Sequence, residues 1–437
     1  DDWLDEAPAL CATYEPAEDA PTTITVGDDG EDYSSIQDAI DAADPGDIIL
    51  VSPGTYTEDL FVGGSLTLKS TGGADVTTIE GTVNLDVDYE LSTVVFGDVD
   101  AGFTVSGSGA EGVYVDSESW SQVTVQGNII TGSWNEGILV SGAGVRCFSS
   151  LSILDNEIRA NGSSGASLAP VRNFSSVEIE RNAITDNAMY GVYLYSDWSK
   201  SVVNHSSAVI VDNDITDNGG DGVYFYSVFN NSSGLVQGNT ISSNAEDGFE
   251  FYEVRHGSTL DLVDNEIRDN EYTGVYGDNV SLQSRASMSE NTIAGNEDYG
   301  IYMYAGPGQR ASLTVEANAI TGNEDEGFFI ESYDVMQGGY LGLLDNEISD
   351  NGSYGVSIFG FYEGGEGLIS GNTIRGNGND GLRVADGVTY GAVLTVQQNT
   401  IEDNQGYGVY IDALEAGSYL ALLDNQVARN QPYGLYL

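Results

Sequence analysis

The sequence predicts an all-β fold, a single right-handed parallel β-helix of about 16 coils with a short capping helix near the N-terminus. Two observations lead to this prediction. A unit of 26 to 31 residues repeats along the chain, with Asn at its start, Ile or Val two residues later and Gly nine residues later. Within each unit apolar and polar residues alternate, which is the period of a strand with one buried face.

The first 22 residues differ from the rest of the chain. They are acidic and rich in Pro and Ala, and we interpret residues 1–22 as a tail. Residues 23–127 are expected to form an N-terminal cap and irregular first coils, and residues 128–437 carry the regular repeat. Because a repeat dominates the chain, its length of 437 residues does not indicate several globular domains.

A short amphipathic helix is predicted over residues 34–43, between two short strands. Ser residues at its start can cap it, and Ile36, Ile40 and Ala43 share one face. A Pro-Gly pair stops the helix. After the second strand, the segment 53–56 (Pro-Gly-Thr-Tyr) is expected to turn the chain.

Fixed offsets define the regular repeat. All 12 units have Gly at the ninth position after the leading Asn, and 11 of them have a second Asn at the fifth. Asn suits tight bends because it tolerates left-handed backbone, and in register it forms amide ladders. The Gly indicates a positive φ or a close backbone approach. The leading residues are Asn128, Asn156, Asn182, Asn213, Asn239, Asn265, Asn291, Asn318, Asn346, Asn372, Asn399 and Asn425.

Each unit is too short to contain a helix, so the expected coil is a flattened loop of about three short strands. A single coil cannot bury its own apolar face. Stacking on its neighbours at ~4.8 Å does so.

The charge of the chain excludes two classes of partner. Asp and Glu outnumber Lys and Arg 69 to 13, giving a formal net charge of −56. Such a surface repels nucleic acid and anionic membranes. No apolar run approaches the ~18 residues of a membrane span, so membrane insertion is not expected.

The N-terminal sequence favours an exported protein. It begins without a visible signal peptide, and we interpret this as a mature start, which predicts an extracellular or cell-surface location. In that setting Cys11 and Cys147 are expected to form a disulfide that pins the tail to an early coil. Two unpaired thiols remain the alternative.

The Asn-x-Ile-x-x-Asn-x-x-x-Gly unit, together with the segment 32–56, resembles the pectate-lyase-like superfamily over roughly residues 24–437. This resemblance implies the β-helix fold. It does not define a function, because the superfamily includes polysaccharide lyases, hydrolases and epimerases, phage tailspikes, adhesins and structural proteins. The Gly-His-Gly and Arg-x-Lys segments of galacturonan hydrolases and the Asp-Pro-His segment of alginate epimerases do not occur in this chain.

Basic residues gather in the variable segment of the repeat, which predicts a cationic stripe along one edge. One interpretation is a groove for an acidic polysaccharide, with catalytic groups among Lys200, His205, Arg255 and His256. The alternative is that these cations balance carboxylates on adjacent coils. The ligand-binding cations would be Arg146, Arg172, Arg285 and Arg310.

Aromatic residues occupy outward positions after the repeat Gly. Tyr193, Tyr224, Tyr276 and Tyr302 are the candidates for holding a ligand, because a row of rings suits sugar faces or a partner protein. Cross-strand stacking, worth roughly 0.2–1 kcal/mol per pair, is the alternative reason for the row.

Metal binding and glycosylation have weaker signals. No cofactor is expected, although Asp28, Asp29 and Asp32 offer carboxylates for calcium; a solvated acidic face is the alternative. Asn-x-Ser sequons, including those at Asn173, Asn204 and Asn279, can carry glycans in an exported protein.

These features support two functions from different classes. The first hypothesis is an exported, non-catalytic structural or adhesive protein. Because the sequence ends in mid-coil, such a protein is expected to associate head to tail into a filament, unless the sequence is a fragment. The alternative is a polysaccharide lyase or epimerase, or a non-catalytic glycan-binding module, acting along one long face.

Overall fold

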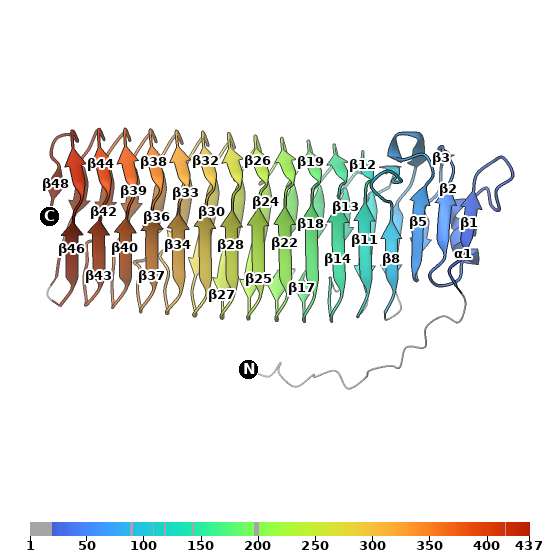
Figure 1. The fold of residues 1–437 in the computed structure, drawn as a ribbon, viewed down its shortest axis with the longest axis horizontal. Coiled ribbons are helices and arrows are strands. Elements are labelled where there is room, and N and C mark those ends of the chain that lie inside the picture. Colours follow the sequence, from blue (N-terminus) through green and yellow to red (C-terminus); the bar gives the residue numbers. More distant parts are fainter. Residues whose placement is uncertain are drawn as a thin grey trace, which may run out of the picture.

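The computed structural model describes residues 20–87, 91–107, 109–117, 119–141, 144–195, 201–415 and 417–437. These residues form one all-β solenoid with a short helix near the N-terminus, as the sequence predicts (Figure 1). Each strand pairs in parallel with the equivalent strand of the next coil, so the coils stack into a straight rod. Cys11 and Lys200 lie outside the described residues.

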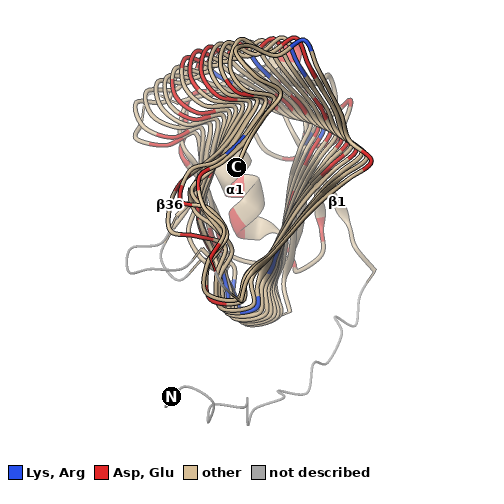
Figure 2. Cartoon of the chain, turned by 90° about the vertical axis from the view of Figure 1, so that its left-hand side faces the viewer, with Lys and Arg blue, Asp and Glu red and all other residues tan. Residues whose placement is uncertain are grey.

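Three parallel sheets form the walls of the rod, and Figure 2 looks along its axis at the superposed coils. We name them sheets A, B and C in the order in which the chain passes through them.

Sheet A has 16 strands. They are β1 (Thr23–Val26), β2 (Ile48–Val51), β5 (Leu66–Ser70), β8 (Thr93–Phe96), β11 (Gln122–Gln126), β14 (Ser150–Leu154), β18 (Ser176–Glu180), β22 (Ser207–Val211), β25 (Ser233–Gln237), β28 (Thr259–Val263), β31 (Arg285–Ser289), β34 (Ser312–Glu316), β37 (Tyr340–Leu344), β40 (Glu366–Ser370), β43 (Val393–Gln397) and β46 (Tyr419–Leu423).

Sheet B has 15 strands of three residues each. They are β3 (Gly54–Tyr56), β6 (Thr77–Ile79), β9 (Thr104–Ser106), β12 (Ile129–Thr131), β15 (Glu157–Arg159), β19 (Ala183–Thr185), β23 (Asp214–Thr216), β26 (Thr240–Ser242), β29 (Glu266–Arg268), β32 (Thr292–Ala294), β35 (Ala319–Thr321), β38 (Glu347–Ser349), β41 (Thr373–Arg375), β44 (Thr400–Glu402) and β47 (Gln426–Ala428).

Sheet C is less regular, because two of its coils add a short second strand, β17 after β16 and β21 after β20. β17 pairs with β21, and β21 pairs with the second half of the longer strand β24. Its strands are β4 (Leu60–Val62), β7 (Val83–Val87), β10 (Val113–Ser117), β13 (Ile138–Val140), β16 (Ala166–Leu168), β17 (Val171–Arg172), β20 (Val192–Leu194), β21 (Val202–Val203), β24 (Val223–Phe229), β27 (Phe249–Arg255), β30 (Val275–Val280), β33 (Ile301–Ala305), β36 (Phe328–Ser332), β39 (Val356–Ile358), β42 (Leu382–Val384), β45 (Val409–Ile411) and β48 (Leu435–Tyr436).

The N-terminal helix α1 (Ile36–Ala42) packs against the first coils. The Ser35 hydroxyl accepts the Asp38 N–H at 3.2 Å and so caps the helix, as expected. Ile36 and Ala39 are fully buried, whereas Ile40 and Ala43 are only partly buried against the core. The segment predicted to turn at 53–56 instead begins sheet B as β3, and the 3-10 helix η1 (Ala74–Val76) follows β5.

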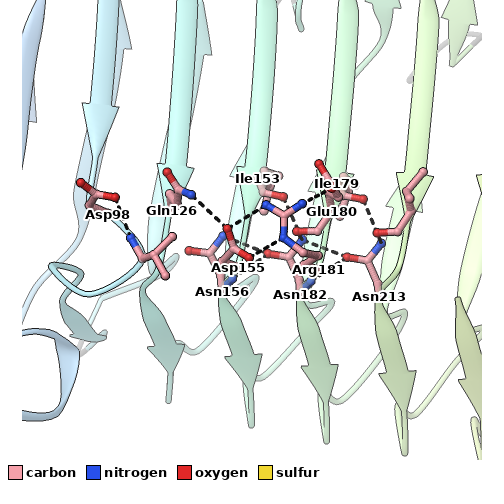
Figure 3. A network of polar contacts seen from close by, with 12 residues as sticks. Asp98, Gln126, Ile153, Asp155, Asn156, Ile179, Glu180, Arg181, Asn182 and Asn213 are labelled. Atoms are coloured by element: carbon pink, nitrogen blue, oxygen red, sulfur yellow. Dashed lines mark hydrogen bonds and ion pairs between the residues drawn. The ribbon is translucent and has the colours of Figure 1, made fainter. Parts of the chain in front are cut away.

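Two ladders of asparagine run along the inside of the rod. In the middle of the first ladder, the Asn156 backbone N–H and side-chain NH₂ both donate to the Asn182 side-chain oxygen, at 2.9 and 3.0 Å. The same NH₂ donates to the Val125 carbonyl at 2.9 Å. Figure 3 shows Asn156, Asn182 and Asn213 in line along this ladder. Each ladder residue therefore satisfies buried backbone groups of its own and neighbouring coils, which confirms the predicted amide ladders.

Contrary to the prediction from the sequence, the tight bends between the strands do not use a left-handed backbone at the ladder Asn. Positive φ falls on the residue just before a ladder Asn, such as Asp155 (55°) before Asn156 and Ala160 (54°) before Asn161. The repeat Gly has no positive φ but a close approach: a Cβ on Gly248 would lie 2.5 Å from Ile267 Cγ2 and 2.7 Å from the Gly274 carbonyl oxygen. Gly therefore recurs at this position because a larger side chain would not fit there, and not because the backbone needs the conformational freedom of glycine.

Candidate functional site

A single row of side chains runs along the outer face of sheet C. The strand register places the second residue after each repeat Gly beside its equivalent in the next coil. This sheet C row brings the four predicted tyrosines into line, with one carboxylate between them. Its members, in coil order, are Tyr193, Tyr224, Glu250, Tyr276, Tyr302, Phe329, Ser357, Arg383, Tyr410 and Tyr436.

The rings of the row stack on one another on both sides of Glu250. Tyr276 and Tyr302 have ring centroids 5.0 Å apart and nearly parallel planes, and Tyr193 stacks at 4.5 Å on Tyr190, the residue before the repeat Gly. Such contacts cover ring faces within the row. At Glu250 the stack is interrupted, so the ring neighbours on either side of this gap are Tyr224 and Tyr276.

Two aspartates lie beside Glu250 at this gap. Asp221 and Asp247 each precede the repeat Gly of their coil, and the Asp247 N–H donates to Asp221 Oδ1 at 2.9 Å. The Thr273 N–H donates to Asp247 Oδ1 at 2.7 Å. One carboxylate oxygen each from Asp221, Asp247 and Glu250 lies within 4.8 Å of the others, the one such group of three in the described part of the chain. We name these three residues, with Tyr224 and Tyr276, the acid–tyrosine site.

Burial and mutual repulsion raise the pKa values of all three acids. Asp221 is buried, and desolvation together with the charges of Glu250 and Asp247 raises its pKa well above the usual 3.8. The pKa of Glu250 is raised chiefly by desolvation, while its interaction with the Asp221 carboxyl acts in the opposite direction. Burial raises the pKa of Asp247 to about 7. Burial, together with the charges of neighbouring carboxylates, also raises the pKa of Tyr276 to about 12.

This arrangement can do two kinds of chemistry. Carboxyls that keep a proton near neutral pH can donate and accept hydrogen bonds with ligand hydroxyls and can transfer protons. Three carboxylate oxygens at this spacing also match the hard oxygen ligands that calcium prefers. Asp28, Asp29 and Asp32, the calcium ligands suggested by the sequence, are exposed at the N-terminal end, where Asp32 accepts hydrogen bonds from Thr25 instead.

The predicted cations that the structure describes lie near the turn that joins sheet C to sheet A, which we call the C–A turn. Arg146 and Arg172 lie side by side in adjacent coils, joined by a parallel backbone bridge. In the following coils the equivalent position is occupied by Val203, Phe229 and Arg255. Arg310 lies on the turn itself. Arg285 begins strand β31 of sheet A.

Carboxylates of the chain itself bind two of these cations. Arg255 pairs with Glu253 at 3.0 Å and Arg285 with Asp261 at 3.1 Å. These contacts agree with the alternative that the cations balance acids on the rod.

The two histidines occupy different positions of the C–A turn. His205 ends an exposed ring stack along this edge, 5.0 Å from Phe174, while His256 contacts Phe229 at 4.4 Å. Neither belongs to the acid–tyrosine site. Cys147 is half-buried on the same turn, and its proposed partner Cys11 lies outside the described residues, so the disulfide stays a prediction.

The acid trio was missed from the sequence, although two signals for it exist. An Asp precedes the repeat Gly in the consecutive coils at 221 and 247, where several other coils have Tyr. Glu250 then replaces an aromatic residue in the sheet C row. These substitutions in the repeat lie in two different coils, and only the register of the stacked coils brings the three acids together.

Comparison with protein families identifies the chain. A family model described as "Right handed beta helix region" matches residues 141–309 and 307–437, more than half of the sequence. The chain belongs to this right-handed β-helix family. In the described part of this β-helix protein, no helix is long and apolar enough to cross a membrane.

Individual relatives are more distant. Over 115 residues the β-helix protein is 34% identical to a "Cell surface glycoprotein" of Methanothermus fervidus, a match that covers 25% of this chain and 17% of the relative. Among solved structures, it is similar to the A-module of the Azotobacter vinelandii mannuronan C-5 epimerase AlgE4 (TM-score 0.42, 15% identity, 92% and 91% of the two chains covered). The periplasmic alginate epimerase AlgG gives a TM-score of 0.43 at 15% identity over 90% and 83% of the two chains.

Proposed function

We propose that this protein is a non-catalytic, adhesive β-helix of the cell surface that binds carbohydrate along the sheet C row. The observation that carries the proposal is the row itself, in which half-exposed tyrosines flank the three acids of the acid–tyrosine site. Aromatic rings and hydrogen-bonding carboxyls together suit sugar rings and their hydroxyls. The partial similarity to a cell surface glycoprotein supports the location.

Charge restricts the ligand to neutral or amino-bearing sugars. The site offers carboxyls rather than cations to a ligand, and the whole chain around it has a net charge of −56. Cations predicted to attract an acidic polysaccharide are paired in part with the chain's own acids. Because like charges repel, an acidic polymer is a poorer ligand for this face than a neutral one.

Retention on immobilised glycans tests this proposal. The panel contains neutral, amino-bearing and uronate polymers. We expect the wild-type protein to bind a neutral or amino-bearing polymer, and the pair of changes Tyr224→Ala and Tyr276→Ala to weaken binding at least tenfold. Tyr419→Ala, on the exposed outer face of sheet A, is the matched control and should bind normally. Equal binding by all variants would contradict the proposal.

A second candidate function is a polysaccharide lyase or epimerase at the same site. It is favoured by one observation, the raised pKa values of three adjacent carboxyls beside two tyrosines, which is an environment found at acid–base catalytic sites. Turnover of a uronate or neutral polymer that is lost in Glu250→Gln, with binding retained, would establish it. Absence of turnover over the whole panel leaves the binding function.

Head-to-tail association into a filament remains a proposal about assembly. Sedimentation at high protein concentration tests it, and a strictly monomeric protein would exclude it.

A further inference from the structure

The folded rod distinguishes sharply between the potential N-glycosylation sites of the sequence. Seven Asn-x-Ser sequons occur, at Asn161, Asn173, Asn204, Asn230, Asn231, Asn279 and Asn351. The sequence alone treats them as equivalent. Attachment of a sugar requires an accessible side-chain amide nitrogen, and recognition of the sequon requires an accessible hydroxyl residue two positions later.

Two of these sequons belong to the interior ladder. Asn161 and Asn351 are 2% and 1% exposed. The Asn161 side-chain NH₂ donates to the Asn187 side-chain oxygen at 2.9 Å, and that of Asn351 donates to Asn377 at 3.1 Å. A glycan at either position would replace a buried hydrogen bond and open the core, so neither is occupied in a folded molecule.

Three further sequons lie in a second asparagine ladder on the C–A turn. The Asn204 NH₂ donates to the Asn173 side-chain oxygen at 3.0 Å, and the Asn230 NH₂ donates to that of Asn204 at 2.7 Å. All three asparagines are half-buried.

The hydroxyl residues of these sequons are buried as well. They are Ser175, Ser206 and Ser232, each 3% exposed. The hydroxyl oxygen of each accepts a backbone N–H from the preceding coil at 3.2 Å. The Asn279 sequon is inaccessible for the same reason, because its hydroxyl residue, Ser281, is only 5% exposed.

The remaining sequon, Asn231-Ser232-Ser233, is open at both of its ends. Asn231 is exposed on the C–A turn with a φ of 56°, and Ser233 is exposed at the start of β25. The Asn231 NH₂ makes one long contact of 3.3 Å, to the Asn230 side-chain oxygen, and this contact is exposed.

We propose that Asn231 is the N-glycosylation site of the folded protein. The donor is an oligosaccharide linked to a lipid diphosphate. The Asn231 amide nitrogen forms a bond to C1 of the first sugar and loses one proton. The bond from C1 to the phosphate oxygen breaks, and the lipid diphosphate leaves. The glycan then projects from the edge of the rod and leaves the outer face of sheet C open.

Modification of the purified, folded chain by an oligosaccharyltransferase with a lipid-diphosphate oligosaccharide tests the proposal, with mass spectrometry of proteolytic glycopeptides as the readout. We expect one occupied position, Asn231. Ser233→Ala should abolish the modification. Ser232→Ala is the matched control: it removes the Asn230 sequon and keeps that of Asn231, so the glycan should remain.

The same reaction on the urea-unfolded chain shows what the fold contributes. We expect additional sequons to become occupied there. A bare Asn231 in the folded chain, together with a modified unfolded chain, would overturn the proposal. A glycan on any of the other six asparagines of the folded chain would overturn it as well.

Discussion

At the scale of single residues, the ladder asparagines hold adjacent coils in register. Asn244 is 0% exposed; its NH₂ donates to the Asn270 side-chain oxygen at 3.0 Å and to the Ile215 carbonyl at 3.1 Å. Its own side-chain oxygen accepts the Asn218 backbone N–H at 3.1 Å. Removing this side chain therefore leaves several buried polar groups without partners.

We predict that Asn244→Ala destabilises the protein by about 1–3 kcal/mol for each buried group left unsatisfied. The urea midpoint of unfolding should fall accordingly. Asn135→Ala is the control, because Asn135 is exposed and makes one long contact to Glu111; its effect should stay within about 0.5 kcal/mol. Similar midpoints for the two variants would contradict a structural role for the ladder.

The raised pKa of Asp247 predicts a pH-dependent stability at the acid–tyrosine site. The folded protein holds this proton up to about pH 7, whereas the unfolded chain releases it near the usual 3.8. The folded state therefore binds more protons between these values, and stability falls as pH rises through this window.

We predict that Asp247→Asn is more stable than the wild type at pH 8, by the order of 2–4 kcal/mol, and that the difference disappears near pH 3.5. The Asn side-chain oxygen can still accept the Thr273 N–H, so the comparison isolates the charge. Unfolding midpoints at pH 3.5, 6 and 8 provide the measurement. A difference that does not change with pH would be inconsistent with this explanation.

At the scale of elements, the repeat Gly sets how closely the turn before sheet C packs on the next coil. At Gly248 an added Cβ would meet Ile267 Cγ2 at 2.5 Å, Gly274 O at 2.7 Å and Asn270 Nδ2 at 2.8 Å. The Gly274 oxygen belongs to the backbone and the Asn270 nitrogen to a ladder side chain. Neither can move without disrupting the stacking of the coils.

We therefore predict that Gly248→Ala lowers stability by about 1–3 kcal/mol through overpacking, and that it lowers the thermal midpoint. Gly64→Ala is the matched control, since an added Cβ there meets nothing within 4 Å. Equal midpoints for the two variants would mean that the repeat Gly has another origin.

Some elements of the fold could be predicted from the sequence and others could not. The repeat unit, the cap helix and the amide ladders follow from local patterns and fixed offsets, and the structure contains all three. The segment at 53–56 was misjudged, because its Pro-Gly pair suggested a turn while sheet pairing makes Gly54–Tyr56 a strand. The acid–tyrosine site was not predicted, because Asp221 lies 26 residues before Asp247 and 29 residues before Glu250 and meets them only through coil register.

At the scale of the whole molecule, stacked coils place like charges close together. A net charge of −56 on a rod gives strong self-repulsion at low ionic strength. Salt shortens the Debye length from about 30 Å at 0.01 M to about 3 Å at 1 M and screens that repulsion.

We predict that the thermal midpoint rises by several degrees between 0.01 and 1 M NaCl, measured by circular dichroism at one pH. A fall in the midpoint over this range would show that self-repulsion does not limit the stability of the rod.

The central claim is that the sheet C row is the carbohydrate-binding face. The most direct test is a crystal structure of the protein with an oligosaccharide of the polymer that it retains. We predict sugar rings on sheet C in contact with Tyr224, Glu250 and Tyr276. Sugar bound instead in the shallow hollow of sheet B lined by Asp214, Thr216 and Arg268, or on the C–A turn, would contradict the claim.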